Sequence, residues 1–290
     1  MRFQRRLLIV PAVLALVVAC AGPGAVSSNA APVSPGFVAL GDSYAAGPIV
    51  PSPIMSAGLC LQSNHNYAHL LAPVLRGMTF RDASCSGAQT TAMTRTQQLL
   101  LGTNPPQFNR LTGATAVVTL EIGGNDIGFT SIVAACGSIV PWGTPCRNAF
   151  VRGTDDRLFD AIKLLAPKIG AVIDGIHARA PYAHVFVLGY PAIVPYTGAG
   201  CWPRLPVTAG DVAYLRTKQQ QLNGTIAMQT ILHRATYVDV YGPSVGRDAC
   251  APASIRWIEP LIPGHPAAPV HPNARGEAAM AVTIRRAMGR

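Results

Sequence analysis

Residues 36–47 read GFVALGDSYAAG, an apolar run that stops at a glycine and passes into polar and small residues. The apolar part, Phe37–Leu40, has no polar side chain on either face, which is typical of a strand buried on both sides of a parallel sheet. Comparable runs recur along the chain. They are Ala116–Leu120, Val185–Leu188 and Tyr237–Val240, with Thr79–Ala83 as a weaker candidate. The sequence therefore predicts a sheet of buried, mostly parallel strands.

Stretches with a helical pattern separate these runs. They are Thr154–Ala178, Ala209–His233 and Asn273–Met288. In the first stretch we expect Thr154 to cap the helix, and Asp155 and Asp156 suit its N-terminus. Strands that alternate with helices predict an α/β fold in which helices cover both faces of the sheet. In such folds the functional side chains lie beyond the carboxyl ends of the strands.

One domain, residues 36–290, is expected to contain the whole fold. The chain has 290 residues, of which 49% are hydrophobic, and this suffices for one large buried core. We find no internal repeat and no second linker. Residues 20–35 are small, uncharged and rich in glycine, proline, serine and alanine, so we expect a flexible tether ahead of the domain. We expect the protein to act as a monomer.

Residues 1–19 are typical of a signal peptide. Three arginines precede an apolar run, Leu7–Ala19, that is shorter than a membrane span. Two processing sites remain open. Val17–Cys20 is similar to the lipobox of bacterial lipoproteins, in which a lipidated Cys20 would tether the protein to the membrane, whereas cleavage after Ser28–Ala30 would release it. The protein is therefore expected to be secreted or anchored to the outer face of the cell membrane.

Six cysteines remain once Cys20 is set aside. They are Cys60, Cys85, Cys136, Cys146, Cys201 and Cys250. About fifteen pairings are open to six cysteines, and we expect neighbours along the chain to pair, each bond closing an irregular stretch. Zinc is the competing interpretation. However, no two of the six are spaced as Cys-x-x-Cys, and an exported chain can keep its cysteines oxidised, so we predict three disulfides and no metal.

The formal net charge of +10 favours acidic surfaces. Basic residues are scattered along the chain and are not interleaved with aromatic residues, so nothing in the sequence indicates a nucleic-acid-binding protein. An anionic cell envelope is the expected neighbour.

Polar blocks stand at the ends of the predicted strands and late in the chain. They are Gly41–Tyr44, Ser84–Ala88, Gly123–Asp126 and His271–Asn273. A serine hydroxyl becomes a useful nucleophile when a base such as histidine accepts its proton. A glycine N–H and an asparagine amide are suitable donors for the oxyanion of a tetrahedral intermediate. The blocks therefore provide the groups that acyl transfer requires.

These four blocks, in this order, resemble the SGNH or GDSL hydrolase family, and GDSYAAG at 41–47 with three expected disulfides is similar to its secreted actinobacterial esterases and lipases. The resemblance implies a three-layer α/β/α sandwich of flavodoxin-like character. It implies Ser43 as nucleophile and His271 as general base. The implied oxyanion hole consists of the Ser43 N–H, the Gly87 N–H and the Asn125 side chain. The implied reaction is ester hydrolysis through an acyl-enzyme, on a small-molecule or lipid ester and without a cofactor.

One position departs from the family pattern. The family often has an aspartate three residues before the histidine, and this chain has Ala268 there. We therefore predict a Ser-His dyad in which a main-chain carbonyl near Ala268 accepts the histidine Nδ1–H and fixes the tautomer. The alternative is a carboxylate from elsewhere in the chain, for which Asp248 and Glu259 are the candidates.

A second serine competes with Ser43 on sequence pattern alone. Ser244 lies in GPSVG at 242–246, which fits the G-x-S-x-G nucleophile elbow. An elbow must lead into a helix, and the cysteine and proline in Arg247–Pro252 argue against one there. We also expect His265 to border the site without a catalytic role, and Asp42 and Asp126 to hydrogen-bond the turns that carry Ser43 and Asn125.

Three questions of function remain open. An acyltransferase or a thioesterase would use the same residues as an esterase, and a non-catalytic envelope-binding lipoprotein could retain the same scaffold. Aromatic residues recur in the expected loops and either line an acyl pocket or pack beneath those loops. These residues are Tyr44, Phe129, Trp142, Tyr196, Trp202 and Trp257.

Overall fold

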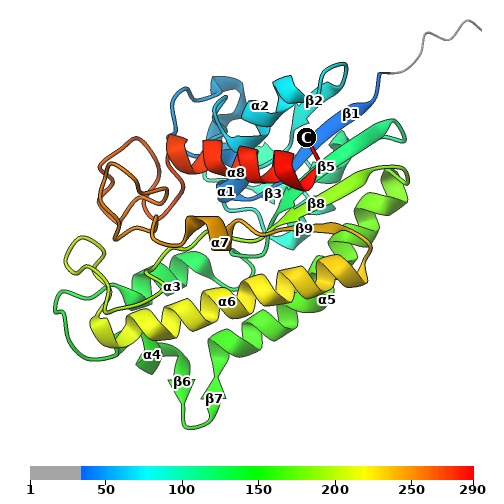
Figure 1. Ribbon diagram of the computed structural model, residues 1–290. Coiled ribbons are helices and arrows are strands. Elements are labelled where there is room, and N and C mark those ends of the chain that lie inside the picture. The colour runs from blue at the N-terminus through cyan, green and yellow to red at the C-terminus, as the bar shows by residue number, and fades with distance from the viewer. Residues whose placement is uncertain (1–33) are drawn as a thin grey trace, which may run out of the picture. The chain divides into compact units, whose positions relative to one another are not determined.

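Five strands form one fully parallel sheet in the order β2-β1-β5-β8-β9, as the computed structural model in Figure 1 shows for residues 34–290. The strands are β1 (Gly36–Gly41), β2 (Thr79–Asp82), β5 (Thr115–Glu121), β8 (His184–Leu188) and β9 (Thr236–Val238). Taken in chain order this is 2-1-3-4-5, the flavodoxin-like arrangement. The predicted α/β fold is confirmed. The predicted signal peptide 1–19, Cys20 and the tether up to residue 33 lie outside the described residues.

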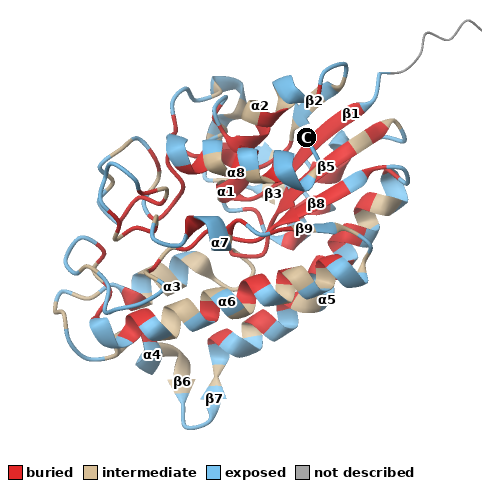
Figure 2. Ribbon diagram, viewed as in Figure 1, coloured by how far each residue is buried: buried red, intermediate tan, exposed pale blue. Residues whose placement is uncertain are grey.

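Two helical layers enclose the sheet (Figure 1). On one face α5 (Arg157–Arg179) and α6 (Ala209–Leu232) pack against Val38 and Leu40 of β1. On the other face α2 (Tyr67–Leu71) and α8 (Ala274–Ala287) pack against Phe37 and Ala39. Alternate side chains of β1 therefore enter opposite cores, which is why the run from 37 to 40 is continuously apolar. Figure 2 shows the resulting burial along the strands and along one side of each long helix.

The start of α5 differs from the sequence prediction. Thr154 does not cap the helix, because it lies in the turn of a small hairpin between β6 (Val151–Arg152) and β7 (Asp155–Asp156). Asp156 is the N-cap instead, and its side chain accepts a hydrogen bond from the Phe159 N–H. The hairpin places its second aspartate at the helix entrance, where a carboxylate satisfies a free backbone donor.

The remaining elements are short and connect the sheet to its layers. The α-helices are α1 (Ser43–Ala46), α3 (Phe129–Cys136), α4 (Pro145–Phe150) and α7 (Tyr241–Ser244), the 3-10 helices are η1 (Met55–Cys60), η2 (Ala72–Val74), η3 (Thr90–Met93) and η4 (Gln107–Arg110), and β3 (Gln97–Gln98) pairs with β4 (Thr103–Asn104). None of the helices within residues 34–290 combines the length and the apolar character needed to cross a bilayer.

Three disulfides close irregular segments. They join Cys60 to Cys85, Cys136 to Cys146, and Cys201 to Cys250. These are the neighbouring pairs that were expected from the sequence. All six cysteines lie outside the strands of the central sheet, five in the connections between strands and Cys250 after β9, so the disulfides leave the strands themselves without a covalent link.

Candidate active site

Ser43 follows β1 directly and is the first residue of α1. The turn before it is closely held. Gly41 has a φ of 149°, and a Cβ at this position would lie 2.4 Å from the Glu121 carbonyl oxygen, so only glycine fits. Gln107 pairs with both backbone groups of Gly41 through two hydrogen bonds of 2.8 Å. Ser43 is therefore presented at the carboxyl edge of the sheet, between β1 and β5, by a rigid support.

His271 stands at the end of a tight turn that begins at Ala268. The His271 N–H donates to the Ala268 carbonyl at 3.2 Å. Proline in the second position and a φ of 62° at Val270 in the third identify a type II turn. A β-branched valine is rare in this left-handed region, and such strain is often found at functional sites. Tyr44 holds the turn, because its hydroxyl donates to the Val270 carbonyl at 2.6 Å.

The imidazole of His271 joins the turn to the serine. Its Nε2 lies 2.8 Å from Ser43 Oγ, and its Nδ1 lies 2.7 Å from the Pro269 carbonyl oxygen. A carbonyl can only accept, so this contact places the proton on Nδ1 and leaves Nε2 free to accept from the serine hydroxyl. Within residues 34–290 these are the hydrogen-bond partners of the ring, and neither belongs to a carboxylate.

The two carboxylates considered from the sequence have other partners. Asp248 accepts from the Cys250 N–H. Glu259 is hydrogen-bonded to Arg256, His265 and Asn273. Burial alone would raise the pKa of Glu259, but these hydrogen bonds outweigh it and lower the pKa to about 2. Glu259 therefore supports the loop before His271 through its own salt bridge, and His265 belongs to that support.

Burial dominates the electrostatics of His271. His271 is 9% exposed, and this burial lowers its pKa to about 4, against the hydrogen bond to Pro269, which raises it. The charged imidazolium loses more solvation than the neutral ring when it is buried. The ring is therefore neutral, in its proton-accepting form, across the ordinary pH range.

The segments that carry the expected oxyanion donors are hydrogen-bonded to one another and to the serine turn. Asn125 follows β5, and its side-chain amide donates to the Ala88 carbonyl at 2.9 Å, which ties this block to the segment carrying Gly87. The segment that carries Gly87 is also bonded to the serine turn, because the Cys85 N–H donates to the Gly41 carbonyl at 3.0 Å. The N–H of Ser43 opens α1 and so has no acceptor within the helix. The structure thus brings all four polar blocks together.

A buried tyrosine connects the serine turn to the asparagine turn, and sequence reasoning missed it. Tyr190 follows β8 and donates from its hydroxyl to Asp42 at 2.6 Å, while the same oxygen accepts from the Gly124 N–H at 2.8 Å. Burial raises the pKa of Asp42 to about 7, against hydrogen bonds from Tyr190 and from the Tyr44 N–H, which lower it. The available signal was position, since Tyr190 directly follows Gly189, the glycine after the predicted strand Val185–Leu188.

The two motif aspartates have different partners. Asp42 caps α1 and hydrogen-bonds the turn that carries Ser43, as expected. Asp126 reaches across to the neighbouring segment, where it accepts from the N–H and the hydroxyl of Thr90 at 2.9 and 2.6 Å. It therefore fixes the Gly87 segment against the asparagine turn.

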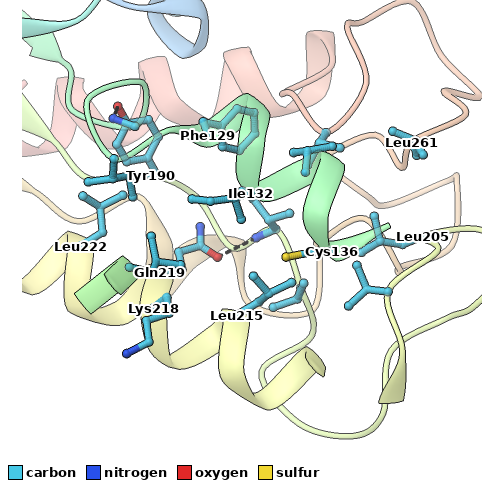
Figure 3. A pocket seen from close by; sticks show the side chains of 18 of the residues that line it. Phe129, Ile132, Cys136, Tyr190, Leu205, Leu215, Lys218, Gln219, Leu222 and Leu261 are labelled. Carbon is cyan, nitrogen blue, oxygen red and sulfur yellow. Dashed lines mark hydrogen bonds between the residues drawn. The ribbon is translucent and has the colours of Figure 1, made fainter. Parts of the chain in front are cut away.

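An apolar pocket opens beside Ser43, between α3, α6 and the connection that follows β8 (Figure 3). Its lining includes Asn125, Ile132, Cys136, Leu205, Leu215, Leu222 and Leu261. Of the aromatic residues raised from the sequence, Tyr44 and Phe129 line it. Trp142, Tyr196 and Trp202 are exposed instead, and Trp257 packs against Arg247. Gly87 borders a separate polar hollow.

The competing serine has a structural role. Ser244 is fully buried at the end of α7, where its hydroxyl donates to the Tyr241 carbonyl and accepts from the Ala192 N–H, both at 2.7 Å. Within residues 34–290 we find no group of three or more acidic, histidine or cysteine side chains arranged to hold a metal ion.

Comparison with known proteins identifies relatives over most of the chain. The model of the GDSL-like lipase/acylhydrolase family matches residues 39–279. Lipase 2 of Streptomyces coelicolor is 42% identical over 84% of this chain and 83% of its own. Phospholipase A1 from Streptomyces albidoflavus superposes with a TM-score of 0.74 at 25% identity, covering 88% of this chain and 99% of that one. The extracellular lipase of Streptomyces rimosus superposes with a TM-score of 0.72 at 26% identity, covering 88% and 100%.

We expect His271 to titrate near pH 4 in the folded protein. A histidine in the unfolded chain has a pKa near 6.5. Between this pH and about 4, the ring is therefore protonated in the unfolded chain and neutral in the folded chain. Stability should therefore fall as the pH is lowered from about 6.5 to about 4, by on the order of 3 kcal/mol for this residue. NMR titration of the ring measures the pKa, with His271→Gln to assign the resonance and remove its share of the pH dependence. A midpoint close to 6.5 would contradict the buried, neutral ring.

Proposed function

Because the chain belongs to the GDSL-like lipase/acylhydrolase family, whose members hydrolyse carboxylic esters, we propose that Ser43 forms the acyl-enzyme and that His271 acts as general base and acid. One observation carries this proposal, the 2.8 Å contact between Ser43 Oγ and a His271 Nε2 whose other nitrogen is fixed by a main-chain carbonyl. This is the arrangement of nucleophile, base and orienting group that activates a serine.

The proposed reaction has two halves. In the first, Ser43 Oγ attacks the ester carbonyl carbon while His271 Nε2 takes the proton of the serine hydroxyl. His271 then gives that proton to the alcohol oxygen as the bond between this oxygen and the carbonyl carbon breaks. In the second, His271 removes a proton from water as the water oxygen attacks the carbonyl carbon of the acyl-enzyme. The bond from that carbon to Ser43 Oγ then breaks, His271 returns the proton to Ser43 Oγ, and the carboxylic acid leaves. The Ser43 N–H, the Gly87 N–H and the Asn125 amide are proposed to face the oxyanion in both tetrahedral intermediates.

His271 is oriented by a main-chain carbonyl, whereas the histidine of a Ser-His-Asp triad is oriented by a carboxylate. The Pro269 carbonyl fixes the tautomer but brings no full negative charge to stabilise an imidazolium. The low pKa of His271 follows from burial without such a charge. The protonated ring is consequently a strong acid, which suits the step in which the leaving alcohol must be protonated.

The lining of the pocket indicates what kind of acyl group the ester carries. Apolar side chains from α3 and α6 line a hollow that begins at Ser43 and Asn125, and apolar surface of this kind favours a hydrocarbon chain over an acetyl group. We therefore propose a lipid ester with an extended acyl chain as substrate. The lipase and phospholipase A1 names of the relatives agree with this class of substrate.

We also propose export. Three disulfides suit an oxidising compartment, and one structural relative is described as extracellular. Residues 1–19 would be the signal peptide and residues 36–290 the hydrolase domain. Lipidation at Cys20 and cleavage after Ala30 remain the alternatives for the mature N-terminus.

Replacing the proposed nucleophile should abolish hydrolysis. We expect Ser43→Ala to lower kcat on a chromogenic ester by at least about 10³-fold and to prevent labelling by a serine-directed phosphonate. Ser244→Ala is the matched control, because it removes a buried structural hydroxyl and should reduce stability while keeping activity and labelling. Retained hydrolysis in the Ser43 variant would refute the assignment.

Tyr44→Phe should weaken catalysis without disturbing substrate binding. The variant keeps the ring against His271 and leaves the Val270 carbonyl without its donor, so the turn that holds the base is less well fixed. We expect kcat to fall about tenfold with KM little changed, since loss of such a bond is worth about 1–3 kcal/mol. Tyr67→Phe serves as the control, because its buried hydroxyl has no hydrogen-bond partner among residues 34–290. An equal loss in both variants would exclude the positioning role.

Narrowing the pocket should shift the preferred acyl length. Ile132 lines the pocket from α3, so Ile132→Trp should lower kcat/KM for p-nitrophenyl decanoate about tenfold or more relative to p-nitrophenyl acetate. Ala134→Trp adds the same side chain on the exposed side of the same helix and should leave the ratio unchanged. If the two variants have the same ratio, the acyl chain lies elsewhere.

A further inference from the structure

Large apolar side chains are exposed in connections that also contribute residues to the pocket lining. Ile139 is 95% exposed, Ile262 is 81% exposed and Trp142 is 70% exposed. Ile139 and Trp142 belong to the connection between α3 and α4, and Ile262 belongs to the long connection between α7 and α8. Exposed apolar side chains that gather in one place are typical of an interaction surface.

Hydrogen bonds join the connection that carries Ile139 and Trp142 to residues 196–206, which carry Trp202. The Ser138 N–H donates to the Pro206 carbonyl at 2.7 Å, and the Trp202 indole N–H donates to the Ser138 carbonyl at 3.1 Å. Leu261 lines the pocket together with Gly137 and Pro206. The exposed residues therefore lie close in sequence to residues that line one pocket. We call this set the apolar rim, and it consists of Ile139, Trp142, Trp202, Leu261 and Ile262.

The segments that carry the apolar rim lack acidic residues. Residues 137–144, 196–206 and 260–270 contain no aspartate or glutamate, although the chain has 13 acidic residues. One of these segments carries an exposed arginine, Arg204, and the formal charge of +10 is still +7 when the three arginines of residues 1–19 are set aside. An apolar surface without carboxylates, on a basic protein, is suited to a lipid assembly with anionic head groups.

We infer that the apolar rim docks the protein onto a lipid surface, so that the pocket mouth faces the lipid. This inference rests on the proposed function, because it supposes that the acyl chain enters the hollow beside Ser43. With Ile139, Trp142 and Ile262 inserted among the lipid chains, an acyl chain passes from one apolar environment into another without crossing water. The tryptophans suit the boundary region, where one part of the ring is apolar and the indole N–H meets polar groups.

Vesicle binding tests the inference without depending on catalysis. The full chain with Ser43→Ala is sedimented with vesicles of phosphatidylglycerol and phosphatidylcholine, and compared with the same protein that also carries Ile139→Glu and Ile262→Glu. We expect binding to weaken at least about tenfold in the second protein, because two charges now oppose insertion. Neither substituted side chain lines the pocket.

The control places the same charges elsewhere. Ile231 and Leu232 are 69% and 63% exposed at the far end of α6, whose first residue contacts the rim connection at Pro141. A rise of 1.5 Å per residue puts them about 33 Å away along the helix. Ile231→Glu with Leu232→Glu should therefore leave vesicle binding unchanged.

Kinetics with a soluble ester separate this inference from the proposed function. For this comparison Ser43 is kept, and only Ile139→Glu and Ile262→Glu are introduced. This rim variant should hydrolyse p-nitrophenyl acetate at the rate of the unchanged protein, and its rate on emulsified lipid ester should fall at least about tenfold. Equal vesicle binding by rim and control variants would overturn the docking surface, even if catalysis by Ser43 stands. Absence of vesicle binding by the parent protein would overturn it as well and would point to a protein partner for the rim.

Discussion

The hydrogen bond from His271 Nδ1 to the Pro269 carbonyl is the contact on which the geometry of the site depends. It joins two residues of one type II turn, so the orientation of the base is set by backbone conformation. The turn holds Val270 at a φ of 62°, which an unsupported valine would avoid. Support comes from the Tyr44 hydroxyl and from the Glu259 N–H, which donates to the His271 carbonyl at 3.0 Å. Contacts distant in sequence therefore stabilise the conformation that orients one ring nitrogen.

Buried polar groups connect this turn to the sheet. Asp42, Tyr190 and the Gly124 N–H form a chain of hydrogen bonds beneath Ser43, so the ends of β1, β5 and β8 contribute to one assembly. Burial also raises the pKa of Glu121 well above its usual range, and within residues 34–290 neither of its carboxylate oxygens has a hydrogen-bond partner. A neutral carboxyl group at this position avoids placing another negative charge near the proposed nucleophile.

The fold and the residues of the site were accessible from the sequence to different degrees. Apolar runs such as 37–40 predicted buried parallel strands because both faces of the sheet are covered, and glycine-bounded polar blocks marked the strand ends. The orienting carbonyl of Pro269 was predicted only as a main-chain group near Ala268, because backbone acceptors have no sequence signature. The Tyr44 bond spans 226 residues and depends on tertiary packing. The N-cap of α5 was predicted at the wrong residue because Thr154 lies in the turn of a short hairpin. The strands of this hairpin have two residues each, and helical periodicity does not reveal them.

One disulfide has a consequence beyond cross-linking. Cys136 is bonded to Cys146 at the end of α3 and is itself part of the pocket lining. The pocket proposed for the acyl chain is therefore bounded in part by a disulfide-bonded cysteine. The redox conditions under which the protein is prepared consequently bear on the wall of this pocket.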